Sequence, residues 1–249
     1  LDAQGQSVGS EPLAPFGDAA GVGTGRNWAH VNSVAYDPTD DSIIISARHQ
    51  GVMKIGRDKQ VKWILAPSVG WKNGLEKKLL KPVDANGKAI KCSPTGDCEG
   101  GFDFTYTQHA AWPRASKKGS IVVFDNGQVR HYEQPALPEM NYSRLVEYKI
   151  DPKKMTVQQT WEYGKERGHE WYSPVTSLTE YHPDKNSIVT YSATAGAEYD
   201  FKNGAFVTAP NPYLSEFKWG AKEPSVEIQI LNNKGYQAMP INLDKAMNN

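Results

Sequence analysis

Three segments of the chain repeat one pattern, and this repeat restricts the fold more than any other feature of the sequence. Each segment runs from a short strand-like stretch through a polar turn to a Ser-Ile pair and a β-branched strand. The segments are HVNSVAYDPTDDSIIISARHQ, HAAWPRASKKGSIVVFDNGQ and TSLTEYHPDKNSIVTYSATAG. Their shared serines are Ser42, Ser120 and Ser187. These anchors are spaced more widely than most structural repeats, so the loops between them must carry insertions.

More strand-like sequence follows each segment. The stretches GVMKIG and VKWILA follow the first, RLVEYKI and TVQQTWEYG the second, and VEIQIL and YQAMPINL the third. Four strands per unit, Gly and Pro at the turns and little helical periodicity predict an all-β protein made of β-propeller blades. The best helix candidate is NGLEKKLL, residues 73–80. We expect blades at roughly 27–66, 102–164 and 171–243, with an inserted loop at 67–101.

Three blades do not close a propeller, since closure needs at least about four blades and an open ring exposes strand edges. The first 27 residues are too rich in Gly and Pro to supply a further blade. The chain begins with Leu, and no charged and apolar leader follows. We therefore expect a mature chain or a fragment, and specifically part of a longer chain.

Charge and composition exclude several classes of partner. The chain has 28 Lys plus Arg and 28 Asp plus Glu, so nothing favours binding to nucleic acid or to an anionic membrane. No apolar stretch approaches the roughly 18 residues that span a bilayer. No metal-binding or nucleotide-binding motif stands in a suitable context. These features predict a soluble protein that needs no metal or cofactor and has no nucleic-acid or membrane partner.

Two cysteines, Cys92 and Cys98, flank a short turn in KCSPTGDCE. Their spacing does not match a CxxC redox motif, and the further ligands of a zinc site are not present. The spacing favours a disulfide, which would stabilise the fold by about 2 kcal/mol in the chain-entropy model. A disulfide would in turn indicate an oxidising compartment. The alternative is two unrelated thiols.

The repeat also predicts a site. His30, His109 and Thr176 lie at similar distances before the three anchor serines, and Arg48 and Asn126 lie at similar distances after two of them. Equivalent positions in successive blades face one another around the propeller axis, where the first strand of each blade lines the central channel. We expect these side chains at the channel mouth. A ring of His, His, Thr and Arg suits an anionic ligand.

The stretch FDFTYTQHAAWP, residues 102–113, alternates between apolar and polar residues as a β-strand does. It predicts one aromatic face and one polar face that ends at His109. The plainer interpretation of His109 is a solvated histidine at the end of a half-exposed strand. His49 follows Arg48 in the preceding unit, so it should point to the opposite face from Arg48.

At NWAHVNS, ISARHQG and FTYTQHAAWP the chain closely resembles the bacterial periplasmic arylsulfate sulfotransferases that use no adenylyl sulfate donor. The resemblance extends over nearly the whole chain and corresponds to roughly the C-terminal half of the family sequence. It implies a six-bladed propeller preceded by a β-sandwich, a homodimer and a periplasmic location. It also implies transfer of a sulfuryl group from a phenolic sulfate ester to a phenol, by a ping-pong mechanism through a sulfohistidine.

The resemblance assigns roles to particular residues. It makes His109 the nucleophile, with His30 and Arg48 as further catalytic residues and Asn32 and Thr176 as substrate-binding residues. It also matches the pair Cys92 and Cys98 to a family disulfide near the site. The family has a further catalytic histidine in the first half of its propeller, and nothing in this chain corresponds to it. That residue is expected from the remaining sequence; otherwise the chain alone is catalytically impaired.

Two functions from different classes follow from these features. The first is the sulfotransferase, in which neutral imidazole attacks sulfur and Arg48 binds the sulfuryl oxygens. The second is a propeller that only binds anionic aromatic ligands, or that hydrolyses aryl sulfates. Stimulation of phenol release by an added acceptor phenol distinguishes transfer from hydrolysis, and no release indicates binding alone.

Overall fold

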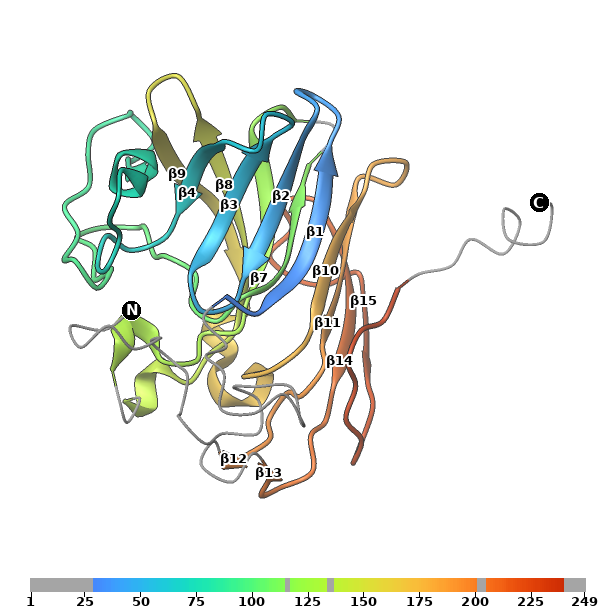
Figure 1. The fold of residues 1–249 in the computed structure, drawn as a ribbon. Coiled ribbons are helices and arrows are strands. Elements are labelled where there is room, and N and C mark those ends of the chain that lie inside the picture. Colours follow the sequence, from blue (N-terminus) through green and yellow to red (C-terminus); the bar gives the residue numbers. More distant parts are fainter. Residues whose placement is uncertain (1–28, 115–116, 134–136, 201–204, 240–249) are drawn as a thin grey trace.

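Nearly all the regular structure is β-sheet in the computed structural model, which describes residues 29–114, 117–133, 137–200 and 205–239 (Figure 1). The two ends of the predicted blades, 27–28 and 240–243, lie outside these residues, as does the N-terminal stretch rich in Gly and Pro. The helical segments are short 3₁₀ turns, and no helix among the described residues is long and apolar enough to cross a membrane.

The first sheet is a four-stranded antiparallel meander in the order β1-β2-β3-β4. Its strands are β1 (Val31–Asp37), β2 (Ser42–Ala47), β3 (Gly51–Gly56) and β4 (Val61–Leu65). The anchor serine Ser42 begins β2 and pairs with Asp37 at the end of β1. The Ser-Ile repeat therefore marks the point where the chain turns from the first strand into the second.

The second and third sheets follow the same plan. The second has the order β6-β7-β8-β9, from β6 (His109–Pro113), β7 (Ser120–Asp125), β8 (Arg144–Asp151) and β9 (Thr156–Tyr163). The short β5 (Lys81–Pro82) of the inserted loop adds to β9 in parallel. The third has the order β10-β11-β14-β15, from β10 (Leu178–His182), β11 (Ser187–Ser192), β14 (Tyr213–Lys218) and β15 (Val226–Gln229). A two-stranded ribbon, β12 (Tyr199–Asp200) with β13 (Ala205–Phe206), lies between β11 and β14 in the chain.

The three sheets stand next to one another in chain order, and none closes on itself (Figure 1). The first strands are neighbours, since β1 packs against β6 and β6 against β10. Two apolar cores fill the spaces between the sheets. The core between the first two contains, among others, Ile44, Val52, Trp63, Val123 and Tyr148. The core between the last two contains, among others, Phe124, Leu145, Trp171, Ile188 and Phe217.

The two ends of this array expose apolar side chains. Val34 and Tyr36 on β1 are 57% and 55% exposed, and Val226 and Ile228 on β15 are 51% and 52% exposed. β-Branched and aromatic residues on strands usually pack against another layer. Both outer faces therefore have the composition of surfaces that a neighbouring sheet covers.

The predicted strand at 102–108 is wrong, because this segment is irregular and β6 begins only at His109. The segment forms no strand because side chains, and not a neighbouring strand, make hydrogen bonds to its backbone. Nη2 of Arg144 donates to the carbonyls of Asp103 and Phe104 at 2.9 and 3.0 Å. The predicted helix at 73–80 is only a 3₁₀ turn at Leu75–Lys78.

Candidate active site

The first strands of the sheets bring the predicted residues together. His30 lies directly before β1, and His109 is the first residue of β6. Their ring centroids are 6.3 Å apart in an edge-to-face arrangement. Arg48 follows the end of β2, and its backbone N–H donates to the His30 carbonyl at 3.0 Å. A guanidinium and two imidazoles from two sheets thus share one small region.

His30 and His109 are not equivalent in strand register, although counting from the anchor serines suggests that they are. Val31 pairs with Ala47, which places His30 opposite Arg48, whereas His109 pairs with Phe124 inside the sheet. Register irregularities in β1 and β6 lie immediately beside these two histidines. Because such bulges redirect neighbouring side chains, they bring the two rings together from different register positions.

The His109 side chain is buried; the residue is 4% exposed. Its Nδ1 lies 2.7 Å from Oδ1 of Asn126. Burial, followed by the charge of Arg48, lowers the pKa of His109 to about 3, although the contacts with Asn126 and with the Thr107 backbone act in the opposite direction. The ring is therefore neutral near pH 7. Its burial excludes the interpretation of His109 as a solvated histidine.

His30 is half-buried, and burial, followed by the charge of Arg48, lowers its pKa to about 4. It is also neutral near pH 7, so it can donate only a neutral N–H hydrogen bond. His49 lies beside it, with ring centroids 5.6 Å apart. The prediction that His49 points away from the site is wrong, because β2 ends at Ala47 and the chain turns before strand alternation could apply.

His49 was not predicted as a site residue. Burial lowers its pKa to about 3, with smaller contributions from Arg48 and His30. Both of its ring nitrogens are buried and have no hydrogen-bond partner among the described residues. His49 lines a small polar pocket together with Arg48, Thr105 and Thr107.

Arg48 connects the three sheets. Its Nη2 donates to the side-chain oxygen of Gln128, which follows β7, and to the Pro174 carbonyl, which precedes β10, at 3.4 Å. Asp125, the last residue of β7, accepts hydrogen bonds from Arg130 and Arg144.

The two predicted substrate-binding residues border the same region. Nδ2 of Asn32 donates to the Gln108 carbonyl at 2.8 Å, which joins Asn32 to the residue before His109. Oδ1 of Asn32 is buried without a hydrogen-bond partner in the described part of the chain. The Thr176 carbonyl accepts a hydrogen bond from Nδ2 of Asn126 at 2.9 Å. The other four predicted site residues are thus linked to His109 directly or through one intervening residue.

The backbone at the site is held in a conformation that non-glycine residues rarely adopt. His30, Ala110 and Thr176 have φ angles of 48°, 52° and 61°. Each such left-handed residue costs on the order of 1 kcal/mol or more and persists only where surrounding contacts hold it. One of them lies at or just before the start of the first strand of each of the three sheets, beside the predicted site residues.

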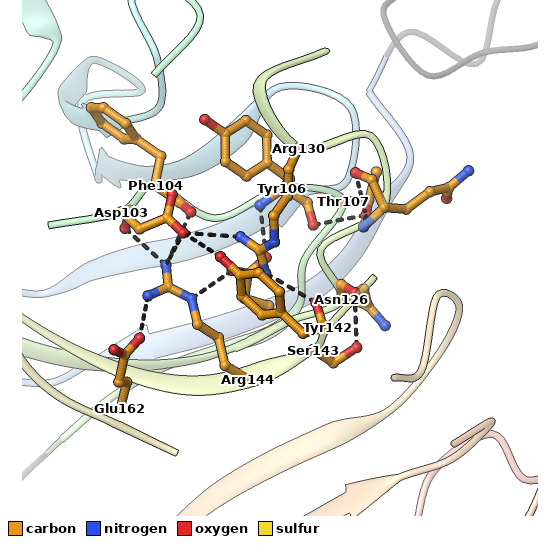
Figure 2. Close-up of polar contacts among 12 residues, drawn as sticks. Asp103, Phe104, Tyr106, Thr107, Asn126, Arg130, Tyr142, Ser143, Arg144 and Glu162 are labelled. Atoms are coloured by element: carbon orange, nitrogen blue, oxygen red, sulfur yellow. Dashed lines mark hydrogen bonds and ion pairs between the residues drawn. The ribbon is translucent and has the colours of Figure 1, made fainter. Parts of the chain in front are cut away.

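A buried ion-pair network supports the segment that leads to His109 (Figure 2). Asp125 accepts hydrogen bonds from Nη2 of Arg130 and Nε of Arg144, both at 2.9 Å, and its other oxygen accepts from the Tyr106 backbone N–H at 2.8 Å. Asp103 accepts a further bond from Arg130 at 3.3 Å. Asp125, Arg130 and Arg144 are at most 1% exposed. The network replaces sheet hydrogen bonds along 103–106.

The predicted disulfide between Cys92 and Cys98 is present. It closes a turn whose Thr95 carbonyl accepts a hydrogen bond from the Tyr106 hydroxyl at 2.9 Å. The inserted loop therefore contacts the irregular segment that precedes His109. In the described ranges no group of three or more His, Cys, Asp or Glu side chains could hold a metal ion.

Comparisons with known proteins show which proteins the chain is similar to. Residues 1–237 match the family model described as Arylsulfotransferase (ASST). The chain is 60% identical over 234 residues to "Arylsulfate sulfotransferase AssT" of Escherichia coli O6:H1 strain CFT073, and 52% identical over 238 residues to the protein of that name from Lelliottia amnigena. These alignments cover 94% and 95% of this chain but 38% of each relative. The chain therefore spans well under half the length of these relatives.

Proposed function

The chain belongs to the arylsulfotransferase family, and from that membership we propose that it carries the nucleophile and part of the anion-binding site of an arylsulfate sulfotransferase. The observation that carries the proposal is the buried neutral imidazole of His109 beside the buried guanidinium of Arg48. A nucleophile and a permanent cation in one site suit transfer of an anionic group between two acceptors. The substrates would be a phenolic sulfate ester and a phenol, and no cofactor would take part.

In the first half-reaction the His109 imidazole attacks the sulfur of the donor ester. A nitrogen–sulfur bond forms, the sulfur–oxygen bond to the aryl group breaks, and the phenolate leaves with the electron pair. The product is a sulfohistidine. Since His109 is neutral near pH 7, no proton has to leave the attacking nitrogen first.

In the second half-reaction the acceptor phenol attacks the same sulfur. A sulfur–oxygen bond forms, the nitrogen–sulfur bond breaks, and neutral His109 is restored. The phenol proton must pass to a base, and neutral His30 lies at a suitable place, with its ring centroid 6.3 Å from that of His109. This sequence is the ping-pong route.

Both half-reactions concentrate negative charge on the sulfuryl oxygens and the aryl oxygen, by analogy with phosphoryl transfer. Arg48 offers a planar set of donors to such oxygens, and the Asn32 amide adds a neutral donor. The Thr176 hydroxyl now donates to the Val175 carbonyl at 2.6 Å, and it would add a second neutral donor by turning toward the anion. Hydrogen bonds already hold Arg48 against two other sheets, so little reorganisation is needed when the anion arrives.

We also propose that the three sheets are consecutive blades of a six-bladed propeller. Their identical meander order, the neighbouring first strands and the exposed apolar faces of β1 and β15 support this architecture. Each relative is longer than this chain, so the other blades and a further catalytic histidine would come from the rest of the protein. The disulfide supports an oxidising compartment, and we place the protein in the periplasm as a homodimer.

The test is to trap the intermediate in the complete protein. Incubation with a radiolabelled aryl sulfate and no acceptor should label the peptide that contains TQHAAWP. The His109→Asn variant should lose both label and turnover while keeping its unfolding temperature. His169→Asn, at an exposed histidine, is the matched control and should change neither.

The same preparation separates transfer from the alternative function. Strong stimulation of phenol release by an acceptor phenol supports transfer. Phenol release at the same rate with and without acceptor would indicate a hydrolase. Binding of the aryl sulfate without phenol release would indicate a ligand-binding propeller. Label on His30 in place of His109 would reverse the assigned roles.

A further inference from the structure

The Asn126 side chain is completely enclosed and fully engaged. The residue is 0% exposed, and its Nδ2 donates to the backbone carbonyls of Ser173 and Thr176 at 2.6 and 2.9 Å. Backbone carbonyls only accept hydrogen bonds, so the nitrogen end of the amide must face these two residues. The oxygen end consequently faces Nδ1 of His109 at 2.7 Å.

An amide oxygen can only accept a hydrogen bond, and so Nδ1 of His109 must be the donor. We propose that Asn126 is a positioning residue that holds neutral His109 with its proton on Nδ1, and that Nε2 is therefore the atom that receives the sulfuryl group. The assignment of the transferred group rests on the proposed function. The assignment of the proton rests only on the contacts of Asn126.

The surroundings of Asn126 hold its amide in this orientation. The Ser143 hydroxyl donates to the backbone carbonyl of Asn126 at 2.8 Å (Figure 2). It also accepts a hydrogen bond from the Ser173 backbone N–H at 2.8 Å. The Ser173 hydroxyl lies 2.8 Å from the hydroxyls of both Ser177 and Thr194. These four hydroxyl-bearing residues are essentially inaccessible to solvent. Rotation of the Asn126 amide would leave two buried carbonyls facing an oxygen, which is unfavourable.

The orientation matters for the chemistry. With the proton on Nε2, the nitrogen lone pair would lie on Nδ1, against Asn126, where an incoming sulfur atom has no access. With the proton on Nδ1, attack forms the sulfur–Nε2 bond and breaks the sulfur–aryl oxygen bond, and the ring keeps its proton. The ring then becomes a cation, so its hydrogen bond to the Asn126 oxygen strengthens as the reaction proceeds.

Two measurements on the complete, unaltered enzyme test the proposal. Nitrogen NMR of the ¹⁵N-histidine-labelled protein should show His109 protonated on Nδ1 and unprotonated on Nε2, with the resonance assigned by its loss in His109→Asn. The trapped adduct, compared after digestion with both synthetic isomers, should be the Nε2-sulfohistidine. A proton on Nε2 or an adduct on Nδ1 would overturn the proposal. If no adduct forms at all, the proposed function fails, while the NMR measurement still decides the tautomer.

The variant Asn126→Leu replaces the amide by an apolar side chain of similar volume, so that both the hydrogen-bond donor and the acceptor are lost. We expect a mixture of His109 tautomers and a turnover at least about 100-fold lower, with KM for the donor changed less than threefold. The exposed residue Asn86 gives the control variant Asn86→Leu, which should behave as the wild type. If Asn126→Leu folds and keeps the Nδ1 proton and the wild-type turnover, Asn126 has no positioning role. If Asn126→Leu does not fold, the NMR and adduct measurements on the unaltered enzyme still test which nitrogen of His109 carries the proton and which receives the sulfuryl group.

Discussion

The guanidinium of Arg48 donates a hydrogen bond to the side-chain oxygen of Gln128, and this contact ties the end of β2 to the loop that follows β7. This hydrogen bond fixes the orientation of the guanidinium before any anion binds. A substitution that keeps the positive charge but not the planar group can therefore show which of the two properties the site needs.

Arg48→Lys keeps the charge but removes the planar set of donors. We expect turnover to fall by one to two orders of magnitude, in line with the loss of one preorganised donor to the transferred group. The melting temperature should change little, since the charge and most of the side-chain volume remain. Steady-state kinetics of the complete enzyme and a thermal unfolding scan measure both effects.

The control for this exchange is Arg57→Lys. Arg57 is exposed and forms an ion pair with Asp41 at 3.0 Å. It should leave turnover unchanged. Near-normal turnover in Arg48→Lys would mean that only positive charge is needed, and a bound sulfate located away from Arg48 would lead to the same conclusion.

Formation of the sulfohistidine should be insensitive to mild acid. Burial lowers the pKa of His109 to about 3, so the reactive neutral form persists as the pH falls through 6.5. A histidine with an ordinary pKa near 6.5 would lose about 30-fold in neutral form between pH 8 and pH 5. We expect the single-turnover rate of adduct formation to change less than about threefold over that range. A decline with a midpoint near pH 6.5 would contradict the buried state of the ring.

Removal of the disulfide should affect activity more than stability. The turn it closes holds the Tyr106 hydroxyl through the Thr95 carbonyl, three residues before His109 in the chain. In the double variant Cys92→Ser, Cys98→Ser we expect a several-fold loss of turnover. So short a loop contributes only about 2 kcal/mol, and the melting temperature should fall by no more than about 5 °C. Full activity in the double variant would show that the turn does not influence the nucleophile.

Asp125→Asn should destabilise the fold strongly. The substitution leaves two buried guanidinium groups without the carboxylate that lies between them, and breaking a buried ion pair costs about 3–5 kcal/mol. Urea unfolding of the complete protein measures the change. Asp41→Asn, which removes the exposed ion pair with Arg57, should change the free energy of unfolding far less. Equal effects of the two substitutions would contradict the role given to the network.

The strands could be predicted from the sequence because their signals are local. The Ser-Ile anchors begin β2, β7 and β11, and alternation of side chains along each strand reflects burial on a sheet face. The segment 102–108 has the same alternation, but its carbonyls are bound by Arg144, which lies about 40 residues further along the chain. Nothing local in the sequence indicates that side chains will replace a strand partner.

The candidate site was predictable to a similar degree. Positions counted from the anchor serines predicted His30, His109, Arg48 and Thr176 as site residues. The prediction was possible because the first strands of successive sheets pack against one another. It did not reveal that His49 turns toward His30, since the alternation rule was applied beyond the end of β2. The sequence also did not predict that the Asn126 amide orients the His109 ring. That contact depends on two backbone carbonyls, about 50 residues further along the chain, that accept hydrogen bonds from the amide nitrogen.

The left-handed backbone at Ala110 sets stability and activity against each other at one position. Glycine adopts this conformation without the steric cost that alanine bears, so Ala110→Gly relieves strain in the native state. It also frees the residue that follows His109 to sample other conformations, and the imidazole direction then becomes less certain. Backbone strain at Ala110 and a fixed direction of the neighbouring imidazole are therefore linked through the methyl group of this one residue.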